Sequence, residues 1–68
     1  MREINIGKNI KAIRNSLNLT QKQFAEKLNI TRSTVNHWEN HEALPNLYML
    51  VAIKDTFGIS YEEIIDGI

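Results

Sequence analysis

The feature that most constrains the fold of this chain is a very short connection between two segments with helix-start signals. Residues 21–28 and 32–39 each follow a threonine that can cap a helix, and Leu28, Asn29 and Ile30 join them. Two short helices joined so closely must cross steeply, as in a helix-turn-helix. Such a turn needs a residue with positive φ, which Asn tolerates better than most residues. We therefore expect Asn29 to lie in the turn, and the small Ala25 to let the second of these helices approach the first.

The remainder of the chain carries helical signals as well, and no stretch alternates as a strand would. Ile6, Ile10, Ile13 and Leu17 recur at steps of four, three and four, which places them on one face of a helix. Asn5 can cap that helix. The later helix starts share capping residues, capping boxes closed by Gln23 and Glu63, and hydrophobic staples. The expected caps are Thr20, Thr31, Asn46 and Ser60, and the staple pairs are Leu19–Phe24, Ile30–Val35 and Ile59–Ile64.

These signals predict an all-α fold of five helices over residues 5–16, 21–28, 32–39, 47–57 and 61–66. Gly58 stands where the end of the fourth helix needs a left-handed residue. Sixty-eight residues are enough for one small domain, spanning 1–68, of marginal stability. Without cysteine the chain has no disulfide or thiolate metal site, which fits a reducing cytoplasm. The polar N-terminus MREINIGKNI resembles neither a signal peptide nor a membrane anchor.

The net charge of zero conceals an uneven distribution. Residues 1–38 carry seven basic and two acidic side chains, whereas residues 39–68 carry one basic and six acidic side chains. A polyanion responds to the local field of a protein rather than to its total charge. The same pattern is also common on ordinary solvated surfaces, so it supports nucleic-acid binding without establishing it.

The segment QKQFAEKLNITRSTVNHWEN, residues 21–40, resembles the helix-turn-helix of the phage Cro and lambda-type repressor family, also called the xenobiotic-response-element family. IKAIRNSLNLTQ (10–21), LPNLYMLVAIKDTFGIS (44–60) and YEEII (61–65) resemble the first, fourth and fifth helices of that family. The family pattern often has Gly at the positions of Asn29 and Asn40, and Asn is the residue that best replaces Gly in a left-handed turn. The resemblance implies a compact five-helix, lambda-repressor-like DNA-binding domain, which in that family is usually a transcriptional repressor and often dimeric.

In a helix-turn-helix the second helix, here residues 31–40, lies in the major groove. Val35 and Trp38 face inward, so the polar side chains on the other side become the candidate base contacts. These are Arg32, Ser33, Asn36 and His37. Phosphate contacts are expected at helix starts, where free N–H groups and the helix dipole attract anions. The candidates are Thr20, Gln21, Lys22, Gln23, Thr31, Asn40 and Asn46; for Gln21 and Asn40 the expectation comes from the resemblance.

Glu39 needs a different explanation, because phosphates would repel its carboxylate. In the resembled family the residues that match Arg14 and Glu39 pair with each other across the core. The resemblance therefore implies a structural ion pair, and Arg14 then contacts no phosphate. The alternative is that both side chains are simply solvated.

The segment HWENH, residues 37–41, superficially suggests a metal site. Its order differs from HExxH, in which Glu directly follows the first His. We therefore expect no metal and no other cofactor. The sequence also has no nucleophile–base–acid set and no glycine-rich phosphate loop, so we expect a protein that is not an enzyme.

The sequence thus predicts a sequence-specific DNA-binding transcriptional regulator, in particular a repressor, with double-stranded DNA as its partner. No small-molecule ligand or membrane is expected. The alternative is a protein-interaction module of the same fold that holds a toxin or another regulator. Reading a pseudo-palindromic operator would require a homodimer, and Ile65 and Ile68 are the candidate interface residues. They could instead fold back onto the fourth helix near Leu47 or Val51.

Overall fold

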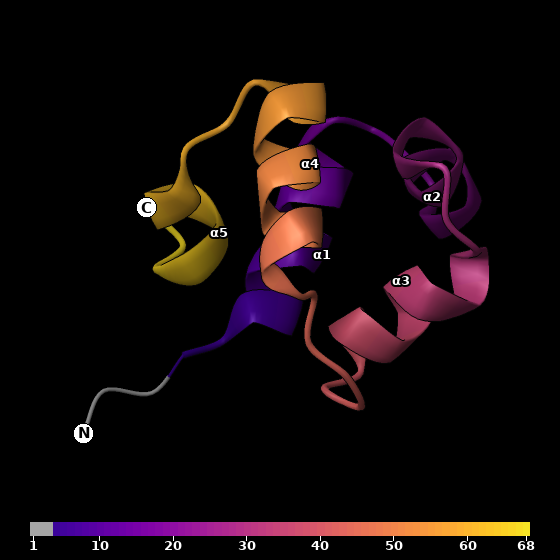
Figure 1. Cartoon of the computed structure of the whole chain (residues 1–68), viewed down its shortest axis with the longest axis horizontal. Coiled ribbons are helices and arrows are strands. Elements are labelled where there is room, and N and C mark those ends of the chain that lie inside the picture. Colours follow the sequence, from indigo (N-terminus) through magenta and orange to yellow (C-terminus); the bar gives the residue numbers. More distant parts are fainter. Residues whose placement is uncertain (1–3) are drawn as a thin grey trace.

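The computed structural model describes residues 4–68; residues 1–3 of the expected domain lie outside the described range. Residues 4–68 form five α-helices in a compact all-α fold (Figure 1). They are α1 (Ile6–Ser16), α2 (Gln21–Leu28), α3 (Arg32–Glu39), α4 (Leu47–Phe57) and α5 (Tyr61–Ile65). The predicted helices are confirmed, except that α1 begins one residue later and α5 ends one residue earlier. None of the helices in residues 4–68 is long and apolar enough to cross a membrane.

Side-chain caps explain why four of these helices begin where they do. Thr20 Oγ1 accepts a hydrogen bond from the Gln23 N–H at 3.1 Å, and Gln23 Oε1 accepts one from the Thr20 N–H at 2.9 Å, which completes a capping box. Thr31, Asn46 and Ser60 cap α3, α4 and α5 through their side chains, as expected. The capping box predicted at α5 is incomplete, because Ser60 Oγ accepts from the Glu63 N–H but the Glu63 side chain accepts no hydrogen bond from the Ser60 N–H. The prediction for Asn5 is wrong: it precedes α1 but its side chain makes no capping hydrogen bond.

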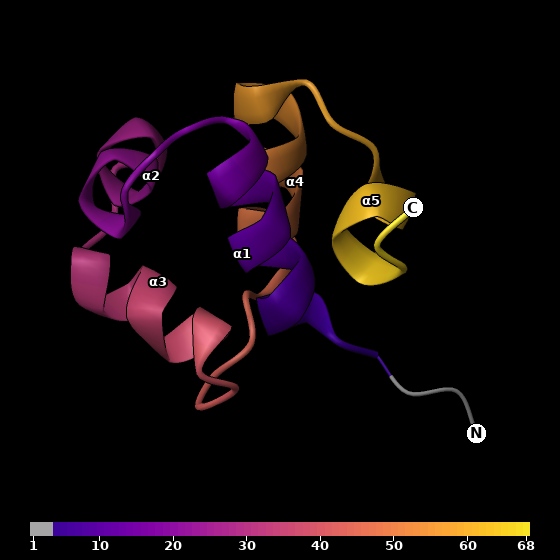
Figure 2. The same cartoon turned by 180° about the vertical axis from the view of Figure 1, so that it is seen from behind.

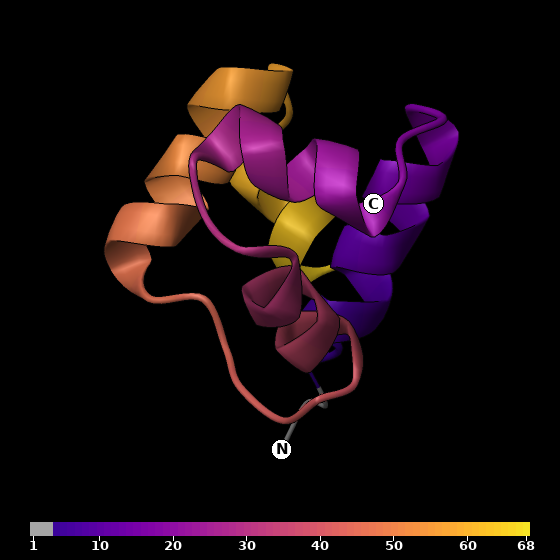
Figure 3. The same ribbon diagram turned by 90° about the vertical axis from the view of Figure 1, so that its right-hand side faces the viewer.

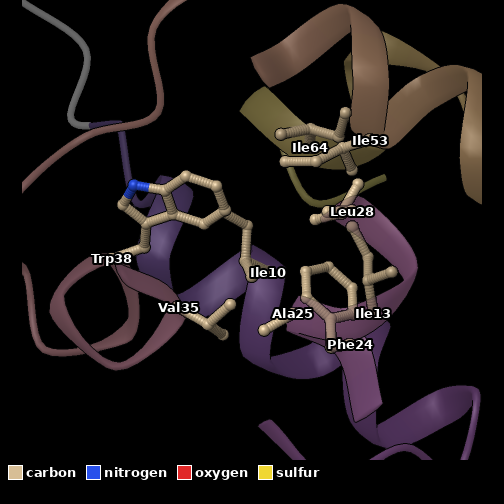
Figure 4. Packing of buried hydrophobic residues seen from close by; sticks show 9 residues of the cluster. All are labelled: Ile10, Ile13, Phe24, Ala25, Leu28, Val35, Trp38, Ile53 and Ile64. Atoms are coloured by element: carbon tan, nitrogen blue, oxygen red, sulfur yellow. The ribbon is translucent and has the colours of Figure 1, made fainter. Parts of the chain in front are cut away.

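The core draws on all five helices. Within residues 4–68, nine buried apolar side chains form one cluster (Figure 4). They are Ile10, Ile13, Phe24, Ala25, Leu28, Val35, Trp38, Ile53 and Ile64. Phe24 of α2 also stacks on Phe57 of α4, with 4.6 Å between ring centroids. Each helix therefore buries its apolar face against the other helices, and the fold depends on packing between them.

The helices are arranged with α1 and α4 at the centre, α2 and α3 on one side, and α5 on the other (Figures 1 and 2). Asn9 Nδ2 donates a hydrogen bond of 2.9 Å to the Ile64 carbonyl and ties α5 to α1. At the other contact of α1, a Cβ atom on Gly7 would collide with the Trp38 carbonyl of α3. Gly7 therefore permits the close approach that holds α3 against α1, and sequence reasoning did not single it out.

Substitutions in α4 test the core. Ile53 is fully buried, whereas Val51, two residues away, is 38% exposed. We expect Ile53→Ala to lower the free energy of unfolding by about 2–5 kcal/mol, because it leaves a cavity. Val51→Ala is the matched control and should change it by about 0.5 kcal/mol or less. Urea denaturation measures both; equal losses for the two variants would contradict the packing described here.

Candidate nucleic-acid interface

The turn between α2 and α3 has the backbone that the sequence predicts. Asn29 adopts the left-handed conformation, with φ 58° and ψ 42°. The Ile30 N–H donates to the Ala25 carbonyl at 3.0 Å and closes the end of α2. Ala25 is buried at the crossing, where a larger side chain would separate the helices. As a result α3 crosses α2 steeply. Figure 3 shows this crossing, with α2 and α3 facing the viewer.

The two sides of α3 differ in character, as expected. Val35 and Trp38 are buried in the core. Arg32, Ser33 and His37 are exposed on the opposite side, so three of the four candidate base contacts are open to a ligand. Asn36, the fourth, is half-buried. Arg can bind guanine in a bidentate manner, while Ser and His can each form single hydrogen bonds to a base edge or a phosphate.

Glu39 forms the ion pair with Arg14. Arg14 Nε donates to Glu39 Oε2 at 2.7 Å and Nη2 donates to Oε1 at 3.0 Å, a bidentate geometry that joins α1 to α3. The side chains are 12% and 3% exposed, respectively. The hydrogen bond to Glu39 raises the pKa of the Arg14 guanidinium above its ordinary value, although burial acts in the opposite direction. Arg14 Nη1 also donates to the Leu19 carbonyl at 2.9 Å, so Arg14 is committed to interactions within the protein.

Gln21 belongs to the same network, which sequence reasoning missed. Its Nε2 lies 3.1 Å from Glu39 Oε1 and 3.3 Å from Asn36 Oδ1, and donates a hydrogen bond to each. The two amide hydrogens of Gln21 are thus used inside the protein. A phosphate oxygen only accepts hydrogen bonds, so a phosphate contact by Gln21 falls to its backbone N–H.

The starts of α2 and α3 present free backbone donors. In the described part of the chain, the N–H groups of Gln21 and Lys22 in α2, and of Arg32 and Ser33 in α3, form no hydrogen bond. Together with the positive end of each helix dipole, such groups attract phosphate. The exposed side chains of Thr20, Lys22, Gln23 and Thr31 surround these donors. Thr34 was not among the candidates. Its hydroxyl oxygen forms a hydrogen bond of 2.9 Å with the hydroxyl oxygen of Thr31.

The end of α3 differs from the expected geometry. Asn40 has φ −93° and is not left-handed; the following residue, His41, takes that conformation with φ 62°. The expectation of a left-handed turn at Asn40 is therefore wrong by one residue. Asn40 is nevertheless exposed, as is Asn46, the remaining phosphate candidate, whose Oδ1 caps α4 by accepting from the Met49 N–H at 2.9 Å.

His37 pairs with a carboxylate that sequence reasoning did not consider. Its Nδ1 lies 3.6 Å from Glu42 Oε2, because the chain turns back after α3 and the Glu42 N–H donates to the His37 carbonyl at 2.9 Å. Among residues 4–68, no group of three or more His, Asp and Glu side chains could hold a metal ion. Glu42 thus places a carboxylate beside His37 at the edge of the exposed face of α3.

Comparison with known proteins agrees with this geometry. The Helix-turn-helix family HTH_3 matches residues 10–64. The chain is 33% identical over 58 residues to the HTH-type transcriptional activator BcrR of Enterococcus faecalis. The matched segment covers 85% of this chain and 28% of BcrR. The chain is 40% identical over 60 residues to the immunity repressor protein of Bacillus phage phi105, covering 88% and 42%, respectively. The chain thus spans less than half the length of either relative.

The fold is also that of a solved structure, the P22 c2 repressor in complex with a synthetic operator. The TM-score is 0.81 at 24% identity, with 93% of this chain and 96% of the other covered. The protein is therefore a non-enzymatic helix-turn-helix DNA-binding domain with a lambda-repressor-like fold. The chain belongs to the Cro/C1-type helix-turn-helix family, as the sequence resemblance indicated.

Substitution of Glu39 tests the ion pair. Glu39→Ala would leave Arg14 largely buried without its carboxylate, and we expect a loss of about 3–5 kcal/mol in the free energy of unfolding. Glu42→Ala, at an exposed carboxylate three residues away, serves as the control. The double variant Arg14→Met, Glu39→Leu should recover most of the loss, because no unpaired charge remains. Thermal unfolding measures these effects. An unchanged melting temperature for Glu39→Ala would rule out this structural role.

Proposed function

We propose that this chain is the DNA-binding part of a sequence-specific transcriptional repressor that works in the cytoplasm. In this proposal α3 enters the major groove, where Arg32, Ser33, Asn36 and His37 face the bases. The starts of α2 and α3 and the side chains of Asn40 and Asn46 face the phosphates. Repression is the simplest outcome, because occupancy of an operator can by itself exclude other proteins from the site.

The observation that carries this proposal is the arrangement of α2 and α3. Exposed polar side chains on the outer face of α3 stand beside free backbone donors at the start of α2. Base edges require side chains that donate and accept hydrogen bonds, and phosphates require donors and positive charge. The exposed Lys22 and Arg32 supply that charge on the same two helices. The immunity repressor of phage phi105, at 40% identity, supports the assignment to repression.

Titration onto duplex DNA at two salt concentrations tests DNA binding. Because bound Lys and Arg release counterions from the phosphates, affinity should fall by at least about tenfold between roughly 50 and 200 mM salt. Glutamate and chloride salts should give the same direction. Absence of binding to any genomic fragment would favour the alternative, a module that holds another protein.

Arg32 tests the assignment of base contacts. It lies at the start of α3 and is exposed. Arg32→Ala should lower affinity for the selected operator by about 1–3 kcal/mol and relax the preference at one base position. Lys27→Ala, an exposed cation near the end of α2, is the control for lost charge. An equal loss on operator and random DNA would make Arg32 a phosphate contact instead.

We further propose a symmetric homodimer on a pseudo-palindromic operator, with Ile65 and Ile68 at the interface. A single helix in one groove reads few base pairs, so two copies about one DNA turn apart, roughly 34–36 Å, are needed for a long site. Ile68 is 84% exposed and Ile65 is half-buried. A second exposed apolar surface lies at the start of α4; its members are Leu44, Leu47, Tyr48 and Val51.

Sedimentation distinguishes the two surfaces. Ile68→Asp should convert a dimer to a monomer without loss of fold, since its side chain is open to solvent. Leu47→Asp is the matched control on the second surface and should leave the dimer intact. A dimer abolished by Leu47→Asp alone would move the interface to α4, and a wild type that stays monomeric on its operator would exclude the dimer.

A further inference from the structure

A chain of hydrogen bonds connects the core ion pair to the outer face of α3. Arg14 donates twice to Glu39, at 2.7 and 3.0 Å, and Gln21 Nε2 donates to Glu39 Oε1 at 3.1 Å. The same Nε2 donates to Asn36 Oδ1 at 3.3 Å. These four residues come from α1, α2 and α3. The buried charge of Glu39 is thereby linked to an amide on the helix proposed to read DNA.

The chemistry of these groups decides which way each amide points. Glu39 is a carboxylate held by Arg14, and a carboxylate can only accept hydrogen bonds. Gln21 must therefore turn its NH₂ group, and not its carbonyl oxygen, toward Glu39. Asn36 faces that same NH₂ group, and a second NH₂ group there would place two donors against each other. Asn36 must consequently turn its carbonyl oxygen toward Gln21, so the orientation follows from the charge of Glu39.

The NH₂ group of Asn36 then faces the other way. It forms no hydrogen bond with any described residue. Within residues 4–68, no buried side-chain nitrogen or oxygen lacks a partner, so this NH₂ group is open to solvent. Asn36 follows Arg32 by four residues and Ser33 by three, which puts the three side chains on one face of α3.

We propose that Gln21 is a positioning residue that determines the base preference of Asn36: it holds the Asn36 carbonyl oxygen and leaves the NH₂ group as the donor to DNA. This inference rests on the function proposed above and specifies how one position of the operator is read. A free Asn can bind adenine in a bidentate manner, as donor to N7 and acceptor from N6. Here Gln21 occupies one of the two lone pairs of that oxygen, which holds the carbonyl side of Asn36 toward α2 and leaves the NH₂ side as the one presented to DNA.

A donor alone distinguishes bases differently. In the major groove guanine presents O6 and N7, thymine O4 and adenine N7 as acceptors, whereas cytosine presents the N4 donor. The base that faces Asn36 should therefore be one with an acceptor, and cytosine should be disfavoured. Because Gln21 holds the carbonyl oxygen of Asn36, the amide cannot turn over to accept a hydrogen bond from cytosine N4.

Selection from a random duplex library, followed by sequencing, tests this proposal. Wild type, Asn36→Ala and Gln21→Met are compared, and the position read by Asn36 is the one that changes in Asn36→Ala. Gln21→Met keeps the size of the side chain but removes its donor. Lys27→Met is the control: Lys27 is exposed on the same helix and belongs neither to the network nor to the proposed DNA contacts. Thermal unfolding of each variant verifies that it is folded.

In the wild type, cytosine should be disfavoured against guanine at this position by about fivefold, the ratio expected for one neutral hydrogen bond. This bias should fall below about twofold in Gln21→Met, where Asn36 can turn its carbonyl oxygen toward cytosine N4, and should persist in Lys27→Met. An unchanged profile in folded Gln21→Met would overturn the proposal. If Gln21→Met does not fold, Asn36→Ala decides alone: loss of the bias against cytosine supports the proposal, and loss of a preference for cytosine overturns it. A wild type that selects no sequence would instead refute the proposed function.

Discussion

The buried carboxylate of Glu39 constrains the relative positions of α1, α2 and α3. A charge that is 3% exposed is costly unless several donors surround it. The donors come from Arg14 on α1 and Gln21 on α2, so satisfying one carboxylate requires three helices to take defined relative positions. The apolar cluster could tolerate small shifts of these helices, but short charge-assisted hydrogen bonds could not. The position of α3 relative to the rest of the domain follows from this requirement.

Much of the fold could be predicted because its signals are local. Thr20, Thr31 and Asn46 cap helices through bonds to residues three positions away, and Asn29 takes a backbone conformation that few residues tolerate. Gly7 and Gln21 could not be recognised in this way, because their roles depend on contacts with α3, distant in the chain. The positive φ of His41 was also missed: histidine is one of the residues enriched in that conformation, but the sequence analysis placed the turn on Asn40, one residue earlier.

In the candidate site, too, some features follow from local sequence signals and others depend on contacts between distant parts of the chain. Exposure of Arg32, Ser33 and His37 follows from the helical period once Val35 and Trp38 are placed inward. The involvement of Asn36 with Gln21 does not, because it depends on how α2 and α3 cross. The likeness to the P22 c2 repressor at 24% identity shows that this backbone accommodates very different side chains. On the function proposed above, the choice of operator would depend on a few exposed residues and not on the fold.

The uneven charge of the chain has a consequence for how the molecule meets DNA. Basic residues such as Lys22, Lys27 and Arg32 lie on α2 and α3, while Glu62 and Glu63 lie on α5, at the other end of the molecule (Figure 1). The longest dimension is 34 Å, several times the Debye length of about 8 Å at physiological salt. At distances well beyond the Debye length, a protein of zero net charge exerts almost no electrostatic force on DNA. If α3 binds DNA as proposed, phosphates within about one Debye length would repel the acidic α5 and attract the basic α2 and α3, which would favour encounters in which α3 leads.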